Sequence, residues 1–449
     1  MFGLITYIGI VFTLASLTLK KPAAAVGGVL CLFALEQWGT STQLFFFENT
    51  QFTNFIIGFI LLLGLLVKFL SSTSTEIQTH RSINTLVVLL YMYSMTSITW
   101  APNYNLSYEQ WVSVWPYIVL SVLLTPLLIS STDDIMAASR SLVLLGSCLI
   151  FLLLFFSDWG TRGIAIIGHK NIYGDPLTAN PLAIANLAGF VAITMAFGNV
   201  WQRVKFWPLI KIVILLVCVA LMIKSGSRGQ TIFLFCSLII FWPFAYKVNS
   251  IKGFSLTVFV TALMIVLTNW AIDDFWSGQV RWSQEQLSAD FGSRFTQSLE
   301  LLHHWWNGGL GNLIFGLGNS ASFDPKIIGG YPHIVPLEVL GEEGLLGFGL
   351  YLAMLVLSAR CIIRILRETK DQPDSRGFFV AICAMYVFSF ILTLKEGSLL
   401  GSTEFFMFTI LIGNCEMILF TEKERRSREE NFLASVPQVL HPSNFRTFI

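Results

Sequence analysis

The amino-acid sequence predicts an all-α, polytopic membrane protein of about 12–14 transmembrane helices, with one long external loop over its functional site. Composition is the first reason: 54% of the 449 residues are hydrophobic and only 12% are charged, whereas about a quarter of the residues of a soluble domain are charged. The mean hydropathy is +0.68. The second reason is that the apolar residues form runs of about 20, the length that crosses a bilayer core.

About 13 such runs can be placed along the chain. The first starts at Phe2, and its positive charges, Lys20 and Lys21, follow it. A secretory signal has the reverse order, so we expect a retained first span with the N-terminus outside. The predicted spans are 2–19, 22–38, 53–70, 84–100, 109–130, 138–157, 181–199, 206–224, 230–247, 253–271, 343–364, 377–395 and 403–420.

Orientation follows from the distribution of Lys and Arg, which are enriched in cytoplasmic links. With the N-terminus outside, 20 of the 28 Lys and Arg residues fall in inside links and 8 in outside links. We therefore expect a single integral membrane domain over residues 1–420, an external loop at about 271–333, and a loosely ordered cytoplasmic tail at 421–449.

Composition and spacing also bear on partners and cofactors. The formal net charge of +1 does not indicate a nucleic-acid partner. The seven cysteines lie in apolar runs without CxxC or CxxH spacing, and we interpret them as packing residues. The adjacent side chains of Asp273 and Asp274 diverge, and no third ligand has suitable spacing. We therefore expect no metal and no other cofactor.

The external cations need an explanation, because they oppose the rule that places the other Lys and Arg residues inside. An anionic ligand is the simplest one. Among them, Arg281 is a candidate substrate-binding residue, and so are His169 and Lys170 in the loop after Trp159. The eight cations are Arg162, Lys170, Lys224, Arg228, Arg281, Arg294, Lys326 and Lys395.

Two tripeptides, Gly226-Ser227-Arg228 and Gly292-Ser293-Arg294, repeat one pattern. In each, Ser is a candidate N-cap and Arg the first helical residue. A cation in the first turn opposes the helix macrodipole unless an anion binds there, and free backbone amides with Arg form a phosphate site. Alternatively, both arginines are loop residues that pair with local acids. The second helix would carry an apolar face of Phe295, Leu299 and Leu302.

His333 lies on the outer side, just before an apolar run. A neutral imidazole there can act as a general base at physiological pH; the alternative is an interfacial histidine that only caps structure. Glu338 and Glu342 are four residues apart and share a helix face. Glu338 is a candidate to orient His333 or to bind a sugar hydroxyl, unless these glutamates simply pair with Lys395 or Arg294.

The reaction that fits these residues is glycosyl transfer from a lipid diphosphate. A diphosphate leaves readily once its charge is neutralised, so the site needs cations rather than a nucleotide loop. Arg228 and Arg294 would hold the diphosphate, and His333 would deprotonate the acceptor hydroxyl for inverting attack. A lipid-linked donor also explains a site at the membrane edge.

Several short motifs resemble the O-antigen ligase and polymerase superfamily, over roughly residues 160–400. Asn180-Pro181-Leu182-Ala183 looks like its Asn-Pro step before a span, and Ser225-Gly226-Ser227-Arg228-Gly229-Gln230 resembles its S-R-G motif. The family's G-x-G…PH(N)…LE…GxxG stretch is similar to Gly316-Leu317-Gly318, Tyr331-Pro332-His333, Leu337-Glu338 and Gly344-Leu345-Leu346-Gly347.

The resemblance implies a multi-span helical fold in a bacterial inner membrane, with an external loop over a site that faces the periplasm or outside. It implies an undecaprenyl-diphosphate glycan as donor and a glycan or glycolipid as acceptor, without nucleotide or metal. The family's two arginines and its histidine correspond to Arg228, Arg294 and His333. The sequence departs at Ile334, where Asn is common, and it lacks a clean Arg-x10-Gly loop signature. Ligase and polymerase therefore both stay open.

Two other functions compete with this hypothesis. A polytopic transporter or lipid-glycan flippase would need charges near the bilayer midplane and usually an internal repeat with broken helices. Here the charges gather at one face, and no repeat is evident. A glycosyltransferase that uses a monophosphate lipid sugar, with metal-binding acids in its first external loop, would find only Glu48 there.

Overall fold

The computed structural model describes residues 1–71, 80–160, 163–170, 176–201, 205–246, 255 and 284–435. Among these residues, ten helices are long and apolar enough to cross a membrane. Strand structure is limited, in the same residues, to one small antiparallel sheet. The chain is an all-α, multi-pass membrane protein, which confirms the predicted fold class.

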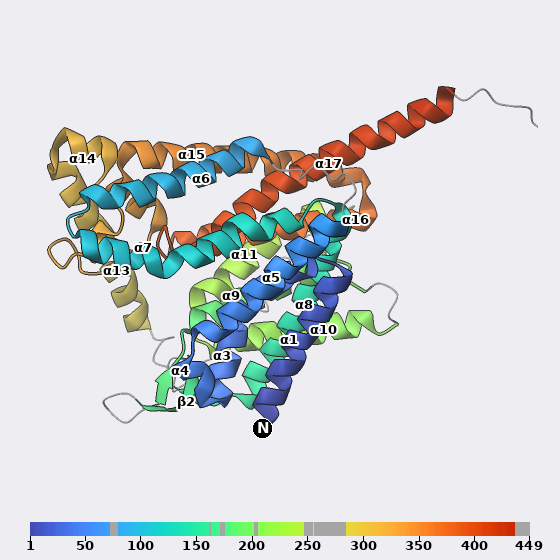
Figure 1. The fold of residues 1–449 in the computed structure, drawn as a ribbon, viewed down its shortest axis with the longest axis horizontal. Helices are drawn as coiled ribbons and strands as arrows, with labels where there is room; N and C mark the ends of the chain where they lie inside the picture. The colour runs from blue at the N-terminus through green and yellow to red at the C-terminus, as the bar shows by residue number, and fades with distance from the viewer. Residues whose placement is uncertain are drawn as a thin grey trace, which may run out of the picture.

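The first half of the chain contributes a bundle of helices and the sheet (Figure 1). Its helices are α1 (Phe2–Lys20), α2 (Ala24–Leu30), α3 (Leu32–Thr42), α4 (Leu44–Glu48), α5 (Gln51–Ser71), α6 (Arg81–Ser97), η1 (Ile98–Trp100), α7 (Tyr104–Tyr117), η2 (Ile118–Leu124), η3 (Thr125–Leu128), α8 (Thr132–Phe156), α9 (Pro181–Phe197) and α10 (Trp207–Lys224). The strands β1 (Trp159–Gly160), β2 (Gly163–Lys170) and β3 (Pro176–Thr178) lie between α8 and α9.

The second half packs against this bundle and carries the longest helices (Figure 1). These elements are α11 (Arg228–Ala245), α13 (Gln284–Asn307), α14 (Gly309–Phe315), η5 (Ala321–Phe323), α15 (Val335–Glu368), η6 (Thr369–Asp371), α16 (Pro373–Thr393) and α17 (Thr403–Ser435).

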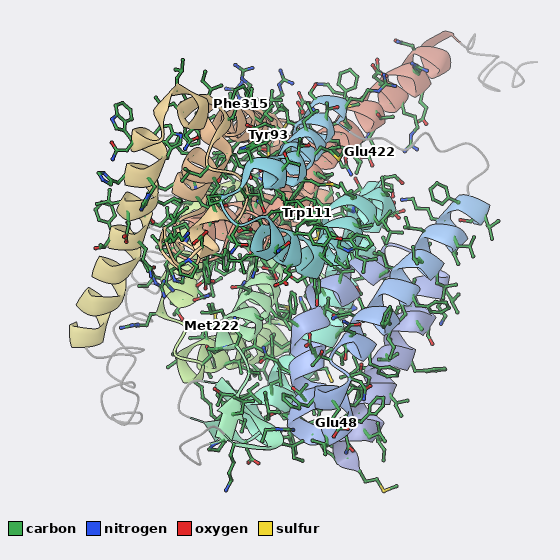
Figure 2. All side chains as sticks on the ribbon, turned by 60° about the vertical axis from the view of Figure 1, so that its left-hand side comes forward. Glu48, Tyr93, Trp111, Met222, Phe315 and Glu422 are labelled. Carbon is green, nitrogen blue, oxygen red and sulfur yellow. The ribbon has the colours of Figure 1, made fainter. Side chains whose placement is uncertain are left out.

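Successive spans alternate in direction, so their ends gather at two faces. We call the face where α1 begins the N-terminal face and the opposite one, toward which α17 runs, the C-terminal face; Glu48 and Glu422 lie at opposite ends of the molecule (Figure 2). Phe2 packs against Trp38 and Phe156 at the N-terminal face, with ring centroids 6.3 and 5.3 Å apart. Two elements of links that the sequence predicts to be external, α4 and β2, lie at this same face (Figure 1).

The core surrounds α9, whose residues are almost all buried. Gly189 lets α16 approach closely, since a Cβ there would lie 2.6 Å from the Phe388 ring. The periphery is apolar as well: Phe12, Phe55 and Leu70 are 73%, 71% and 78% exposed. Large exposed apolar side chains on the outer helices are what a lipid-facing surface requires, because lipid tails are as apolar as the side chains.

Several predicted boundaries change in the structure. The predicted span 22–38 is two short helices, α2 and α3, that break at Cys31. The predicted span 343–364 begins at Val335, and the last span continues as one helix to Ser435. Loose order after residue 420 is therefore wrong for 421–435. The predicted span 253–271 lies outside the described residues, apart from residue 255.

The small sheet was not predicted. β1 pairs with β2 through Trp159 and Ile164, and β2 pairs with β3 through Ala165 and Thr178, both antiparallel. The sheet follows α8 at the N-terminal face and packs against α3 and α4. The sheet therefore covers the N-terminal end of α9. There Asn180 caps the helix, because its side chain accepts a hydrogen bond from the N–H of Leu182 at 3.0 Å.

A kink at Gly344 divides α15 into a short outer segment and a long span. Gly344 has φ +64°, and a Cβ there would lie 2.4 Å from the backbone nitrogen of Gly316. Gly316 has φ +82°, and its Cβ would lie 2.0 Å from the Glu342 carbonyl oxygen. Glycine is needed at both positions because the backbone around Gly316 contacts the backbone around Gly344 directly. This contact explains a glycine in each of the G-x-G and GxxG motifs.

We expect Gly344→Ala to destabilise the protein by more than about 1–3 kcal/mol, the strain of a side chain in this glycine-only backbone region, because the methyl group also collides with backbone. Gly349→Ala is the matched control: it lies on the same helix, and nothing lies within 4 Å of its Cβ position. Thermal unfolding in one detergent measures both. Equal thermal midpoints for the two variants would contradict the role of the kink.

Candidate functional site

Three segments far apart in the sequence bring cationic side chains to one place on the N-terminal face. Arg228 begins α11, Arg294 lies on α13, and Lys395 lies in the link between α16 and α17. Burial is the main cause that lowers the pKa of Lys395, and the charges of Arg294 and Arg228 lower it further. The three cations therefore lie within electrostatic range of one another. We call them the cationic cluster.

Arg228 is the first residue of α11, as predicted, with Ser227 at the N-cap position. The capping contact itself differs from the prediction, because the Ser227 side chain makes no cap hydrogen bond. Instead, the Ser225 hydroxyl donates to the Ser227 hydroxyl at 2.9 Å. Gly226 takes φ +68° to make this tight turn. The turn places Arg228 and the amides of the first helical turn at the N-terminal face, where the helix macrodipole favours negative charge.

Gly229 makes room for the Lys395 ammonium beside the start of α11. A Cβ at Gly229 would lie 2.3 Å from Lys395 Nζ. A cation at this end of a helix is opposed by the macrodipole, which makes the approach of Lys395 unfavourable by itself. An anion bound between Lys395 and the first turn of α11 would make the approach of Lys395 favourable.

Arg294 occupies a different position from the one predicted. It lies in the middle of α13, which runs unbroken from Gln284 to Asn307, so it does not begin a helix. Its Nη1 donates to the Lys395 carbonyl oxygen at 2.9 Å, which fixes α13 to the link that carries Lys395. The buried face of α13 consists of Ser298, Leu301 and Trp305.

The apolar face predicted for this segment is not its most buried side. Phe295 and Leu299 are 47% and 48% exposed, and Leu302 is half-buried. The residues that face the protein are one position away from them on the helix. Arg294 shares that inward face with Ser298 and Leu301, because the spacings of four and three residues return to one side of a helix.

Glu396 is the carboxylate that pairs with the cationic cluster. Its Oε2 lies 3.6 Å from Lys395 Nζ, and its Oε1 accepts a hydrogen bond from Gln230 Nε2 at 2.6 Å. Burial raises the pKa of Glu396 and lowers that of Lys395, so desolvation weakens the ion pair from both sides. Glu396 thus partly offsets the charge of the Lys395 ammonium.

His333 lies beside this cluster and is held there by its neighbours. Its backbone has φ +65°, an uncommon left-handed conformation, and its ring lies 4.1 Å from the Tyr331 ring, centroid to centroid. Ser298 fixes the segment by donating to the Pro332 carbonyl oxygen at 2.9 Å. Burial raises the pKa of Tyr331, and the charge of Arg294 opposes that rise. Tyr331 thus links the imidazole to the cationic cluster.

The glutamates of α15 hold loops. Glu338 is 2% exposed and accepts the Leu399 N–H at 3.0 Å. Glu342 accepts the N–H groups of Ser320 and Ser322 at 2.7 and 2.9 Å. Glu338 is therefore placed as a support for the link that carries Lys395, rather than as a side chain open to a sugar.

The other predicted substrate-binding residues lie apart from these contacts. His169 packs against Phe47, with ring centroids 3.9 Å apart, and Lys170 is exposed at the end of β2. No contact that the structure records joins either of them to the cationic cluster. Arg281 lies outside the described residues.

Sequence reasoning missed the importance of Lys395, Glu396 and Gln230. Lys395 was noticed as one external cation among eight and as a possible partner of Glu338 and Glu342, but not as a site residue. A signal was present: Lys395-Glu396-Gly397 places two charges and a flexible residue at the end of a long apolar run. Gln230 directly follows the Ser-Arg-Gly motif, and its amide holds Glu396.

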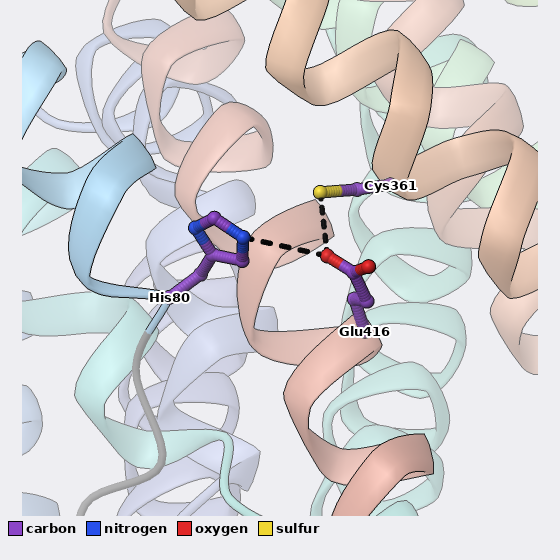
Figure 3. Close-up of side chains that lie close together, drawn as sticks. All are labelled: His80, Cys361 and Glu416. Carbon is purple, nitrogen blue, oxygen red and sulfur yellow. Dashed lines mark hydrogen bonds and ion pairs between the residues drawn. The ribbon is translucent and has the colours of Figure 1, made fainter.

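A second polar cluster lies near the C-terminal face and brings together the potential metal ligands His80, Cys361 and Glu416 (Figure 3). Cys361 Sγ donates to Glu416 Oε2 at 2.7 Å, and His80 Nε2 lies 3.4 Å from the same oxygen. His80 Nδ1 accepts the N–H of Ile83, so the proton of a neutral ring is on Nε2. Arg364 donates to the other oxygen of Glu416 at 2.7 Å.

This arrangement fits a satisfied carboxylate better than a metal site. Glu416 already receives three donors, and a metal would have to displace the protons of both Cys361 and His80 Nε2. Metal-bound histidines donate their second N–H to an acceptor, whereas the second nitrogen of His80 faces a backbone donor.

No protein-family model and no curated protein sequence matches this chain. The candidate site is therefore defined by its own chemistry. It combines three cations, one ion-paired carboxylate, a helix N-terminus and an imidazole beside a phenol. Such a site can bind a multiply charged anion and accept a proton next to it.

For the His80 cluster we expect neither EDTA nor added Zn²⁺ to change the thermal midpoint of the purified protein. Zinc bound at a hundred times its dissociation constant would stabilise the fold by about 2.7 kcal/mol. Cys361→Ser keeps a donor to Glu416 and is the matched variant. A zinc-dependent rise in the midpoint of the wild type that disappears in Cys361→Ser would overturn the hydrogen-bonded assignment.

Proposed function

We propose that this protein is a membrane glycosyltransferase that transfers a glycan from an undecaprenyl-diphosphate donor to a sugar hydroxyl of an acceptor glycan or glycolipid. The proposed reaction is of the O-antigen ligase or polymerase type and needs neither nucleotide nor metal. The proposed location is the inner membrane of a bacterium, with the N-terminal face toward the periplasm.

The observation that carries this proposal is the gathering of three cations at the start of α11. Arg228, Arg294 and Lys395 come from three separate segments, and the charges of both arginines are close enough to lower the pKa of the Lys395 ammonium. Burying like charges together is costly unless a ligand of opposite charge is present. A diphosphate supplies that charge and would also accept hydrogen bonds from the arginines and the α11 amides.

The proposed roles follow from the positions of the side chains. The acceptor hydroxyl gives its proton to a ring nitrogen of His333, and its oxygen attacks the anomeric carbon of the donor sugar. The bond from that carbon to the diphosphate oxygen breaks, and the electron pair leaves with the lipid diphosphate. Arg228, Arg294 and Lys395 stabilise the charge that develops on this leaving group. Attack opposite to the leaving group inverts the anomeric centre.

Purified protein, supplied with an undecaprenyl-diphosphate oligosaccharide and acceptor glycolipids, should form product in the presence of EDTA. Arg228→Ala, Arg294→Ala and His333→Ala should each reduce the rate by about 10²–10⁴-fold, the range for removing a charge-stabilising or general-base group. Lys326→Ala is the control, because Lys326 is an exposed cation in the loop that precedes His333. This variant should keep full activity. The length distribution of the product distinguishes a polymerase from a ligase.

Full activity of His333→Ala would remove the general-base assignment. Loss of activity with EDTA would refute the metal-independent reaction. Absence of transfer to every acceptor, combined with movement of the lipid-linked glycan across reconstituted vesicles, would favour the transporter or flippase alternative.

The pKa of Lys395 gives an independent test of anion binding. Because burial lowers that pKa below the ordinary value of about 10.4, the ammonium loses its proton at a lower pH than a free lysine. A bound diphosphate favours the ammonium, so binding takes up a proton and its affinity falls as pH rises through the lowered pKa. Without ligand, the same shift makes the free energy of unfolding rise with pH between the two values.

Titration calorimetry with inorganic diphosphate, between about pH 7 and 10, measures this dependence. Lys395→Arg stays charged throughout and should bind with a shallower dependence on pH. Identical pH profiles for wild type and Lys395→Arg would show that Lys395 does not bind the anion.

A further inference from the structure

A cavity of about 550 Å³ opens beside the cationic cluster, within the range of about 300–1,000 Å³ for small-molecule sites. It is formed by α3, the start of α9, the end of α16 and the start of α17, segments that meet at the N-terminal face. The polar side chains that decide its chemistry are Glu36, Gln37, Asn180, Asn186, Glu396 and Glu404.

The charge of this cavity is opposite to that of the cluster. Glu36, Glu396 and Glu404 contribute three carboxylates to its wall, and no Lys, Arg or His is among the described residues that line it. Carboxylates only accept hydrogen bonds when ionised. The described wall offers many hydrogen-bond acceptors and no cation, so it favours groups that donate hydrogen bonds over anions.

Two side-chain amides in the wall also favour a ligand that donates hydrogen bonds. Gln37, only 7% exposed, donates through Nε2 to the Asn180 carbonyl oxygen at 2.7 Å. Asn186 donates through Nδ2 to Glu404 Oε2 at 3.1 Å. These bonds fix the orientation of both amides, and within the described residues neither Gln37 Oε1 nor Asn186 Oδ1 has a hydrogen-bond partner. Buried acceptors without donors are costly, so a ligand that brings donors is favoured.

Tyr331 connects the cavity to the proposed base, His333. Tyr331 lines the cavity, and its ring lies 4.1 Å from the His333 ring. Glu396 also lines the cavity and forms the ion pair with Lys395. A hydroxyl that gives its proton to His333 therefore belongs to a molecule that enters from the cavity, while the diphosphate occupies the cationic side.

We propose that the cavity binds the acceptor as a neutral or amino sugar, through hydroxyl and ammonium donors, and rejects a sugar that carries a carboxylate or phosphate near the reacting hydroxyl. The assignment of this sugar as the acceptor depends on the proposed glycosyl transfer, whereas the charge preference of the cavity does not. Glu36 and Glu404 set the preference, Gln37 and Asn186 supply the neutral acceptors, and Glu396 borders the diphosphate.

The test compares three β-1,4 disaccharides of equal size by saturation-transfer NMR and calorimetry on the purified full-length protein. The probes are chitobiose with free amino groups, neutral cellobiose, and cellobiuronic acid with a carboxylate. We expect the affinity to decrease in that order. Glu404→Gln, which keeps an acceptor for Asn186, should weaken chitobiose by on the order of tenfold and leave cellobiose nearly unchanged.

Glu48→Gln is the matched control, because this exposed carboxylate of α4 lies on the same face but does not line the cavity. Binding of inorganic diphosphate and the thermal midpoint should be unchanged in both variants, which confirms folding. Equal or tighter binding of cellobiuronic acid overturns the proposal, and so does the absence of any disaccharide binding. If the disaccharides bind in the expected order and no transfer occurs, the charge preference stands and the proposed glycosyl transfer fails.

Discussion

The loops of the N-terminal face depend on buried carboxylates of one helix. A backbone N–H removed from water must find an acceptor, and close to a bilayer water is scarce. Three glutamates of α15 provide these acceptors: Glu342 for Ser320 and Ser322, Glu338 for Leu399, and Glu343 for the Asn319 side chain at 3.2 Å. Because those loops precede His333 and follow Lys395, one helix positions both sides of the candidate site.

Hydrogen bonds of this kind also hold together the segments that carry the cations. Arg294 donates to the backbone of Lys395, and Gln230 holds Glu396, so the ends of three segments are fixed by directed hydrogen bonds. The segments that carry the cations are thus joined by directed hydrogen bonds. Under the proposed function, cations that the fold has already brought together would bind a diphosphate without a further cost of assembly.

The sequence predicted the spans well because their signal, an apolar run of fixed length, needs no knowledge of the tertiary structure. It failed where packing overrides local signals. Gly292-Ser293 resembles a helix start, yet α13 runs through it because Ser298 and Leu301 are buried on its inward face. The sheet at 159–178 was missed because its strands are short. Arg228 and His333 were found from local motifs, whereas the meeting of Lys395 with Gly229 exists only in three dimensions.

Glu396 connects the two chemical halves of the N-terminal face. One of its oxygens accepts Gln230, the other faces Lys395, and the same side chain lines the acidic cavity. Opposite charges a few ångströms apart in a partly buried region interact strongly, so a ligand is oriented by its own charge distribution. Under the proposed function, the anionic leaving group would lie on the side of α11, and the hydroxyl-rich acceptor on the side of α3 and α9. Orientation of this kind would bring the two proposed substrates together with their reacting atoms between the cations and the imidazole.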